Sequence, residues 1–257
     1  MKHWTTKLGG LALLGLGACG GGGELPPPAP PASVPTPAGT APAAILFLGN
    51  SHTHVNNVPE LVRELFQQGG GAVAVQAAPD YLFLDERLSD GRSVALLASA
   101  GWTHVVLQAQ KLSSSWQFIY PTAEAQEWVR RVKERQALPV LFPEWPRAGQ
   151  DEAGRIYAVY ESIAKASPAC LAPVPQAFDR VRSAWPELPL YAADGNHSSP
   201  AGALLAAFVL YASASGKPLE AGPPLLSSPV DAASQALLRE QARASLAAGP
   251  SARAYCP

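Results

Sequence analysis

Two kinds of hydrophobic pattern alternate from residue 43 to the end of the chain. Short continuous apolar runs are typical of strands that are buried on both faces. Between these runs, apolar residues recur every three or four positions, which is the spacing of helices with one buried face. The strands are predicted at 44–48, 72–75, 103–107, 138–142 and 169–173, and the helices at 58–68, 122–136, 151–166, 199–216 and 231–249.

The order of these elements predicts the fold class. Strands that alternate with helices through short connections imply a mainly parallel sheet that is covered by helices on both sides. The segment 43–257, about 215 residues, is long enough for one domain with a substantial core. In such sheets the chemistry lies at the carboxyl ends of the strands.

The first 18 residues have the pattern of a targeting segment. Two lysines precede a short apolar stretch at 11–16, which is too short to span a bilayer as a permanent helix. The stretch ends in Leu16-Gly17-Ala18-Cys19, which resembles a bacterial lipobox. We therefore expect 1–18 to be a lipoprotein signal peptide and Cys19 to be lipidated. The alternative is a plain signal peptide with an incidental cysteine.

The segment 19–42 has the composition of a tether. It is rich in glycine and proline and has almost no charged or large apolar side chains, so it cannot bury enough surface to fold. A lipidated Cys19 would hold the domain to a membrane of the bacterial cell envelope. Because Gly20 follows the cysteine, we expect the outer membrane in a Gram-negative host, facing the periplasm or the cell surface.

Charge and cysteine content narrow the partners. The formal net charge is −1, and no basic block is present, so we expect no nucleic-acid partner. Beyond Cys19 the chain has Cys170 and Cys256, which in an oxidising envelope are able to form one bridge near the C-terminus. The sequence does not test the geometry of this pair.

A first polar cluster, Gly49-Asn50-Ser51, follows the first predicted strand directly. Glycine permits a tight turn there, and Ser51 would stand exposed at the strand end, near backbone N–H groups that are able to bind an oxyanion. That place suits a nucleophile. Serine needs a positioned base, however, and the cluster alone fits an ordinary turn or helix-cap serine equally well.

A second polar cluster, Asp194-Gly195-Asn196-His197, precedes the long apolar helix at 199–216. Two intervening residues allow the Asp194 carboxylate to accept a hydrogen bond from His197 Nδ1 while Nε2 faces a third group. This is the division of roles in a catalytic triad. The alternative is a solvated loop aspartate and histidine.

Together the clusters resemble the SGNH (GDSL-like) hydrolase superfamily. Its strand followed by G-D/N-S matches Gly49-Asn50-Ser51, and its D-x-x-H block matches 194–197. The resemblance implies a flavodoxin-like, three-layer α/β/α sandwich with a mainly parallel five-stranded sheet. It also implies esterase, lipase or acyl-transfer chemistry without a cofactor, with Ser51 as nucleophile, His197 as base and Asp194 as its partner. The expected partner is an acyl ester of a polysaccharide, a lipid or a small alcohol.

The residues expected around the oxyanion depart from the family pattern. The family supplies a glycine after the second strand and a G-x-N asparagine after the third, and neither is present here. Gln108 stands near the asparagine's place and could donate from its side-chain NH₂, with Gln110 a poorer candidate. We place Asn50 and Trp145 beside the oxyanion or the substrate as well. Trp145 could equally be a rim aromatic that packs on a loop.

Two other functions stay open. His52-Thr53-His54 has the H-x-H spacing of metal-dependent hydrolases, and with Asp194 and His197 it could form a metal site. Against this, about 215 residues is short for the (β/α)₈ barrel that usually carries the motif, so we predict no metal. The other function is a non-catalytic surface lipoprotein that binds a glycan in the same cleft.

Overall fold

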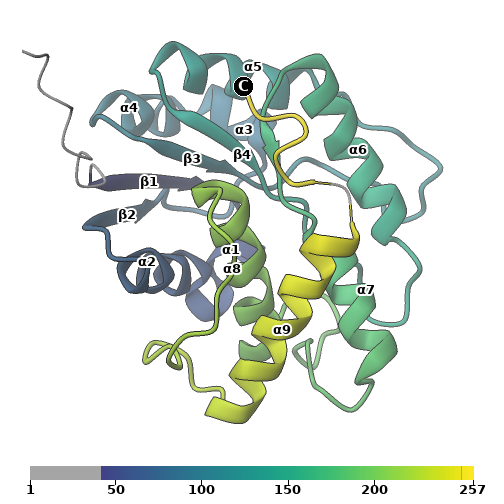
Figure 1. Cartoon of the computed structure of the whole chain (residues 1–257). Coiled ribbons are helices and arrows are strands. Elements are labelled where there is room, and N and C mark those ends of the chain that lie inside the picture. Colours follow the sequence, from purple (N-terminus) through teal and green to yellow (C-terminus); the bar gives the residue numbers. More distant parts are fainter. Residues whose placement is uncertain (1–41, 250) are drawn as a thin grey trace, which may run out of the picture. The chain divides into compact units, whose positions relative to one another are not determined.

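The computed structural model describes residues 42–249 and 251–257. The predicted signal peptide at 1–18, Cys19 and the tether up to residue 41 lie outside the described residues. In the described part, five strands form one parallel sheet in the order β2-β1-β3-β4-β5 (Figure 1). The strands are β1 (Ala43–Leu48), β2 (Val73–Ala77), β3 (His104–Leu107), β4 (Leu138–Leu141) and β5 (Cys170–Leu171).

Helices connect and cover these strands. They are α1 (Ser51–His54), the 3₁₀ turn η1 (Val55–Asn57), α2 (Val58–Gln68), α3 (Leu84–Ser89), α4 (Arg92–Ala98), α5 (Ala123–Glu134), α6 (Ala153–Ala166), α7 (Val174–Ala184), α8 (Pro200–Ser215) and α9 (Ala232–Ala248). Helices α2, α7, α8 and α9 pack on one face of the sheet, and α3, α4, α5 and α6 pack on the other (Figure 1).

The inner strands are almost entirely apolar because both faces of the sheet are buried there, whereas the edge strand β2 leaves Ala74 and Gln76 exposed. In β1, Ile45 and Phe47 belong to the core beneath α2 and α8, whereas Leu46 and Leu48 belong to the core beneath α5 and α6. Side chains along a strand point alternately to opposite faces, so a continuous apolar run fills two cores at once. The predicted three-layer α/β/α sandwich with its flavodoxin-like strand order is confirmed.

Helix α8 is buried along almost its whole length, and its first turn holds the segment that precedes it. Ser199 Oγ accepts hydrogen bonds from the N–H groups of Ala201 and Gly202, at 3.1 and 3.2 Å, and so caps the helix. A Cβ at Gly202 would lie 2.2 Å from the carbonyl oxygen of Leu190, so only glycine permits this close approach. The segment that carries the second polar cluster is thereby held against the start of α8.

The predicted elements match those in the structure to within a few residues, but four helices were not predicted. Helices α1, α3 and α4 are four, six and seven residues long, which is too short to show a clear periodicity. Helix α7 begins at Val174 with a proline at its second position, directly after the short strand β5. No element is predicted from the sequence over the residues of α7.

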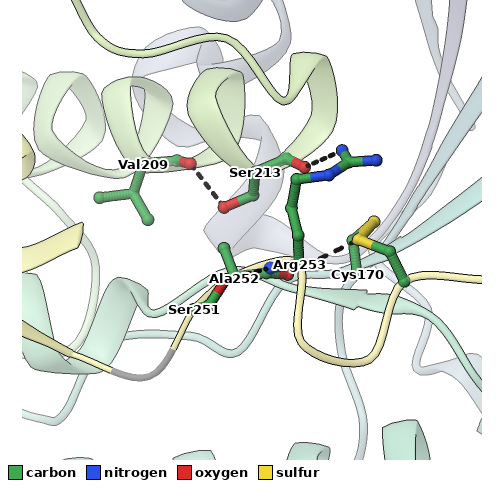
Figure 2. The surroundings of a disulfide bond; sticks show 7 residues. Cys170, Val209, Ser213, Ser251, Ala252 and Arg253 are labelled. Carbon is green, nitrogen blue, oxygen red and sulfur yellow. Dashed lines mark hydrogen bonds between the residues drawn. A yellow bond between two sulfur atoms is a disulfide. The ribbon is translucent and has the colours of Figure 1, made fainter. Parts of the chain in front are cut away.

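A disulfide joins Cys170 in β5 to Cys256 near the C-terminus. Beside it, the N–H of Leu171 donates to the carbonyl oxygen of Ala252 at 3.0 Å. Arg253 contacts the carbonyl oxygen of Ser213 near the end of α8 (Figure 2). The C-terminal segment thus covers the outer edge of β5, which would otherwise expose unpaired backbone groups. None of the helices in the described part is long and apolar enough to cross a membrane.

Candidate active site

Ser51 is the first residue of α1, directly after β1 and at the carboxyl edge of the sheet. The Asn50 side chain accepts a hydrogen bond from the N–H of His52 at 3.0 Å and so caps this short helix. Asn50 also lines the cavity described below. Ser51 was expected to stand exposed at the strand end; in the structure it follows β1 directly and is half-buried.

The peptide group between Gly49 and Asn50 is held by two buried polar side chains. Gln108 Oε1 accepts from the Asn50 N–H at 2.9 Å and also from Thr53 Oγ1 at 2.9 Å. On the other side, Arg87 Nη2 donates to the Gly49 carbonyl oxygen at 2.6 Å. Both Gln108 and Arg87 are fully buried. The peptide that precedes Ser51 is therefore fixed at both its N–H and its carbonyl oxygen.

Arg87 also connects this turn to the loop that follows β2. Its guanidinium donates to the carbonyl oxygens of Pro79 and Asp80, the latter at 2.7 Å, and to Ser93 Oγ at 2.9 Å. Burial lowers the pKa of this guanidinium, while the charges of Asp90 and Asp80 act in the opposite direction. Arg87 was not predicted as a site residue, because a single arginine in an unpredicted helix carries no recognisable motif.

The second cluster faces Ser51. His197 Nε2 lies 2.8 Å from Ser51 Oγ, and His197 Nδ1 lies 2.5 Å from Asp194 Oδ2. Asp194 Oδ1 accepts from the N–H groups of Asn196 and His197, both at 2.9 Å. The hydrogen bond from the His197 ring, followed by these two backbone donors, holds the pKa of Asp194 well below its usual range. The carboxylate is therefore ionised and oriented towards the imidazole.

Two side chains from other elements hold the loop that carries His197. Trp145 Nε1 donates to the Asn196 carbonyl oxygen at 2.8 Å, and Asn56 Nδ2 donates to the Ser198 carbonyl oxygen at 2.7 Å. The Trp145 ring is buried and stacks on Phe178 with the ring centres 5.1 Å apart. Trp145 thus lines the cavity and also holds the His197 loop through its hydrogen bond to Asn196.

The two histidines of the H-x-H motif contact different neighbours. His52 is packed between Trp145 and His197, with ring centres 5.0 and 5.4 Å away. Burial and the neighbouring His197 lower the pKa of His52 to about 4, so it is neutral. His54 lies against Tyr81 instead. Across residues 42–249 and 251–257, no three histidine, cysteine, aspartate or glutamate side chains are grouped as a metal-binding set.

A cavity of about 330 Å³ opens beside Ser51 and His197. It is lined by Asn50, Ser51, His52, Phe83, Leu112, Ser113, Ser114, Trp116, Glu144, Trp145, Arg147, Glu152, Ile156, Asn196 and His197. Glu144, directly after the fourth strand, was not predicted as a site residue. The only available signal was its position in the sequence Phe142-Pro143-Glu144-Trp145, at the carboxyl end of a strand.

Gln108, predicted as an oxyanion donor, is placed behind the nucleophile turn and is not among the residues that line the cavity. Its Nε2 has no partner with hydrogen-bond geometry among the described residues, although it lies near enough to Glu144 to help lower that carboxyl's pKa. Gln110 Nε2 donates to the carbonyl oxygens of Lys111 and Pro121 and so connects the two ends of the loop 111–121. The role of Gln108 as oxyanion donor stays a prediction.

A serine, a histidine and an aspartate in line at the carboxyl edge of a parallel sheet is the arrangement of a three-layer α/β/α hydrolase. Comparison with solved structures places the chain in one family. It is similar to a proposed SGNH hydrolase from Slackia heliotrinireducens, with 31% identity, a TM-score of 0.53, and coverage of 66% of this chain and 97% of that one. The protein belongs to the SGNH hydrolase superfamily.

More distant structures share the fold. A DUF4886 family protein from Bacteroides uniformis is 17% identical with a TM-score of 0.61, over 80% of this chain and 95% of that one. A family 3 carbohydrate esterase from Clostridium thermocellum is 14% identical with a TM-score of 0.52, over 66% of this chain and 93% of that one. No protein-family model and no curated protein sequence matches the chain.

Proposed function

We propose that this protein is a serine ester hydrolase that acts through Ser51, His197 and Asp194. The observation that carries this proposal is the continuous line from Ser51 Oγ to His197 Nε2, 2.8 Å, and from His197 Nδ1 to Asp194 Oδ2, 2.5 Å. Both distances are within hydrogen-bond reach before any substrate binds. The geometry therefore supports a serine that is already paired with its base.

The proposed reaction has two steps. Ser51 Oγ attacks the ester carbonyl carbon while His197 Nε2 takes the hydroxyl proton, and Asp194 stabilises the resulting imidazolium. Collapse of the tetrahedral intermediate breaks the bond to the alkoxy oxygen, which receives that proton from His197 and leaves as the alcohol. A water, deprotonated by His197, then attacks the acyl-enzyme and releases the acid and free Ser51.

Backbone N–H groups are the first candidates to stabilise the oxyanion. Ser51 occupies the first position of α1, where an N–H has no partner within the helix. Gln108 remains the proposed side-chain donor, provided that its unpartnered Nε2 turns towards the reacting carbonyl when substrate binds. Losing one good oxyanion donor typically lowers turnover by about 10²–10³-fold.

The lining of the cavity favours an ester of a polar alcohol. Phe83 and Trp116 offer apolar ring faces, whereas Ser113, Ser114 and Arg147 offer polar groups. Ring faces combined with a few polar groups suit a sugar, which has both apolar faces and hydroxyl groups. We therefore propose an acylated carbohydrate as substrate, ahead of a lipid ester. The Clostridium thermocellum structure, described as a carbohydrate esterase, agrees with this proposal but is similar only in fold.

The proposed place of action is the bacterial cell envelope. This rests on the lipobox-like sequence that ends in Cys19 and on the glycine- and proline-rich segment 19–42. The disulfide between Cys170 and Cys256 supports an oxidising compartment, because such bonds persist outside the cytosol. Metabolic labelling with a fatty-acid analogue should mark the wild-type protein and leave the Cys19→Ser variant unmarked.

A fluorophosphonate probe tests the proposed activity, because it forms a covalent bond only with an activated serine. We expect labelling of the wild type and of a matched control, Ser89→Ala, in which an exposed serine of α3 is removed. Ser51→Ala should not be labelled and should not hydrolyse p-nitrophenyl acetate. Labelling that survives in Ser51→Ala would refute the assignment. A wild type that binds acetylated glycan but is neither labelled nor hydrolytic would instead be a binding protein.

A further inference from the structure

Glu144 is a carboxyl group in the same cavity as Ser51 and His197, and the triad does not use it. It follows β4, so it stands at the same edge of the sheet as Ser51. The nearest cation along its own loop, Arg147, is occupied by another acid. Arg147 pairs with Glu152, which accepts from both its side chain and its backbone N–H. Among the described residues, Glu144 forms no salt bridge.

A buried tyrosine fixes the orientation of this carboxyl group. Tyr160 Oη accepts a hydrogen bond from the Gln110 N–H at 3.1 Å and lies 2.9 Å from Glu144 Oε2. Since burial and the neighbouring carboxyl raise the pKa of Tyr160 well above its ordinary value, the hydroxyl keeps its proton and donates it to Glu144. Tyr160 is thus the donor that holds Glu144 from the protein side; Gln108 Nε2 lies near the same carboxyl but without hydrogen-bond geometry, and Glu144 Oε1 has no hydrogen bond among the described residues.

A purely structural role does not explain an acid at this position. Glutamine has the same shape and would accept the Tyr160 hydrogen bond without the cost of burying a charge that has no counter-ion. Glu144 is half-buried in the cavity wall, and desolvation there raises its pKa to about 7. An unpaired acid in a cleft beside a nucleophile is the kind of group that binds or processes substrate.

From this geometry we infer that Glu144 is a specificity-determining residue that accepts a hydrogen bond from a free hydroxyl group of the substrate's alcohol part. This rests on the proposed function. Above a pH of about 7 the Glu144 carboxyl is mainly ionised. An ionised carboxylate only accepts hydrogen bonds, so its partner in the substrate must be a donor. Esters of sugars carry such hydroxyl groups beside the acylated oxygen, whereas aryl and simple alkyl esters do not. The substrate class is therefore a partly acylated carbohydrate with free hydroxyl groups.

A matched pair of substrates tests the inference. One is a methyl glucoside that bears a single O-acetyl group and free hydroxyls; the other is the same acetate with its remaining hydroxyls methylated. The measured quantity is the ratio of kcat/KM for the first to kcat/KM for the second. We expect the wild type to have a ratio of roughly ten or more, because a hydrogen bond to a charged group typically contributes that much discrimination. In Glu144→Gln the ratio should fall to near one.

Three further measurements separate the outcomes. The control Glu187→Gln, at an exposed position outside the cavity, should keep the wild-type ratio. Tyr160→Phe should lower the ratio in part, and it serves as the second variant if Glu144→Gln does not fold. Near pH 7, the pH profile of kcat/KM for the hydroxyl-bearing substrate should lose one ionisation in Glu144→Gln.

Two results would overturn the inference in distinguishable ways. If the wild type hydrolyses both acetates at equal rates, or if Glu144→Gln and Tyr160→Phe both keep its ratio, the inference is wrong and the proposed function stands. If the wild type hydrolyses neither acetate and Ser51 is not labelled by fluorophosphonate, the proposed function fails and this inference fails with it.

Discussion

Arg87 Nη2 donates a hydrogen bond of 2.6 Å to the carbonyl oxygen of Gly49, two residues before the candidate nucleophile. The guanidinium is fully buried, and its hydrogen bonds go to backbone carbonyls and a serine hydroxyl rather than to a carboxylate. A charged group in such a place is costly unless its donors are satisfied. Arg87 therefore links the loop after β2 to the turn after β1, and the position of Ser51 depends on this link.

Arg87→Met should impair both folding stability and turnover. The substitution keeps the apolar bulk but leaves the buried carbonyl oxygen of Gly49 without its donor, which costs about 1–3 kcal/mol, and it also removes the contact to the Asp80 carbonyl oxygen. We expect a lower free energy of unfolding in urea and a fall in kcat of roughly tenfold or more, as small misplacements of a reacting group are expensive.

The matched control for this variant is Arg92→Met. Arg92 is largely exposed and pairs with Asp80 at the surface, so its loss should change stability by less than about 1 kcal/mol. If both substitutions had the same small effect on kcat and unfolding, Arg87 would have no special role in holding the turn.

The meeting of Ser51, His197 and Asp194 was predictable from the sequence for a physical reason. Ser51 follows β1 directly, and Asp194 and His197 lie three residues apart in one loop, so each cluster is local and keeps a fixed spacing. The carboxyl edge of a parallel sheet then brings the clusters together. The sheet was predictable for the same kind of reason, since each of its strands is a short apolar run.

Arg87 and Glu144 were not predictable because their partners lack a sequence signature. Arg87 bonds mainly to backbone carbonyl oxygens, which every residue possesses, so no pattern of side chains marks the interaction. Glu144 is defined by burial and by Tyr160, sixteen residues further along in α6, and burial depends on the packed fold. Gln108 was noticed as a polar end to an apolar strand, but its placement behind the turn depends on contacts with Asn50 and Thr53.

Gly49→Ala should disrupt the nucleophile turn by steric overlap. A Cβ at this position would lie 2.1 Å from Thr53 Oγ1 and 2.7 Å from Gln108 Oε1, and neither side chain has room to move because each is buried. Overpacking of this kind costs about 1–3 kcal/mol. Thermal unfolding and p-nitrophenyl acetate hydrolysis should both show the loss. Gly101→Ala, where no atom lies within 4 Å of the added Cβ, is the control that should leave both nearly unchanged.

Asp194→Asn should reduce turnover without a large effect on folding. The amide keeps the size of the side chain but no longer stabilises the imidazolium, and it allows the wrong tautomer of His197. In serine hydrolases of other folds such a change lowers kcat by roughly 10³–10⁴-fold. Steady-state kinetics with p-nitrophenyl acetate and circular dichroism would check this. A loss of less than about tenfold in kcat would show that Asp194 is not the orienting group.

Removal of the disulfide should lower stability and leave the active site intact. Cys170 and Cys256 are separated by 86 residues, so the bond restricts a long stretch of the unfolded chain, and its loss should cost about 2–4 kcal/mol. The expected result for Cys256→Ser is a lower midpoint in guanidinium denaturation with kcat within about twofold of the wild type. Added dithiothreitol should destabilise the wild type to the same level and have no further effect on the variant.

The titration of Glu144 should be visible in the pH dependence of stability. Burial raises its folded-state pKa from 4.5 to about 7, so between these pH values the folded protein holds a proton that the unfolded chain has released. The stability linked to this proton is fully present below pH 4.5 and is lost as the pH rises towards 7. Since Glu144→Gln does not titrate, the variant should gain about 3 kcal/mol relative to the wild type across that range. Urea unfolding at several pH values measures this difference, and every other ionising group cancels because it is common to both proteins. A difference that stays constant with pH would mean that Glu144 has an ordinary pKa in the folded protein.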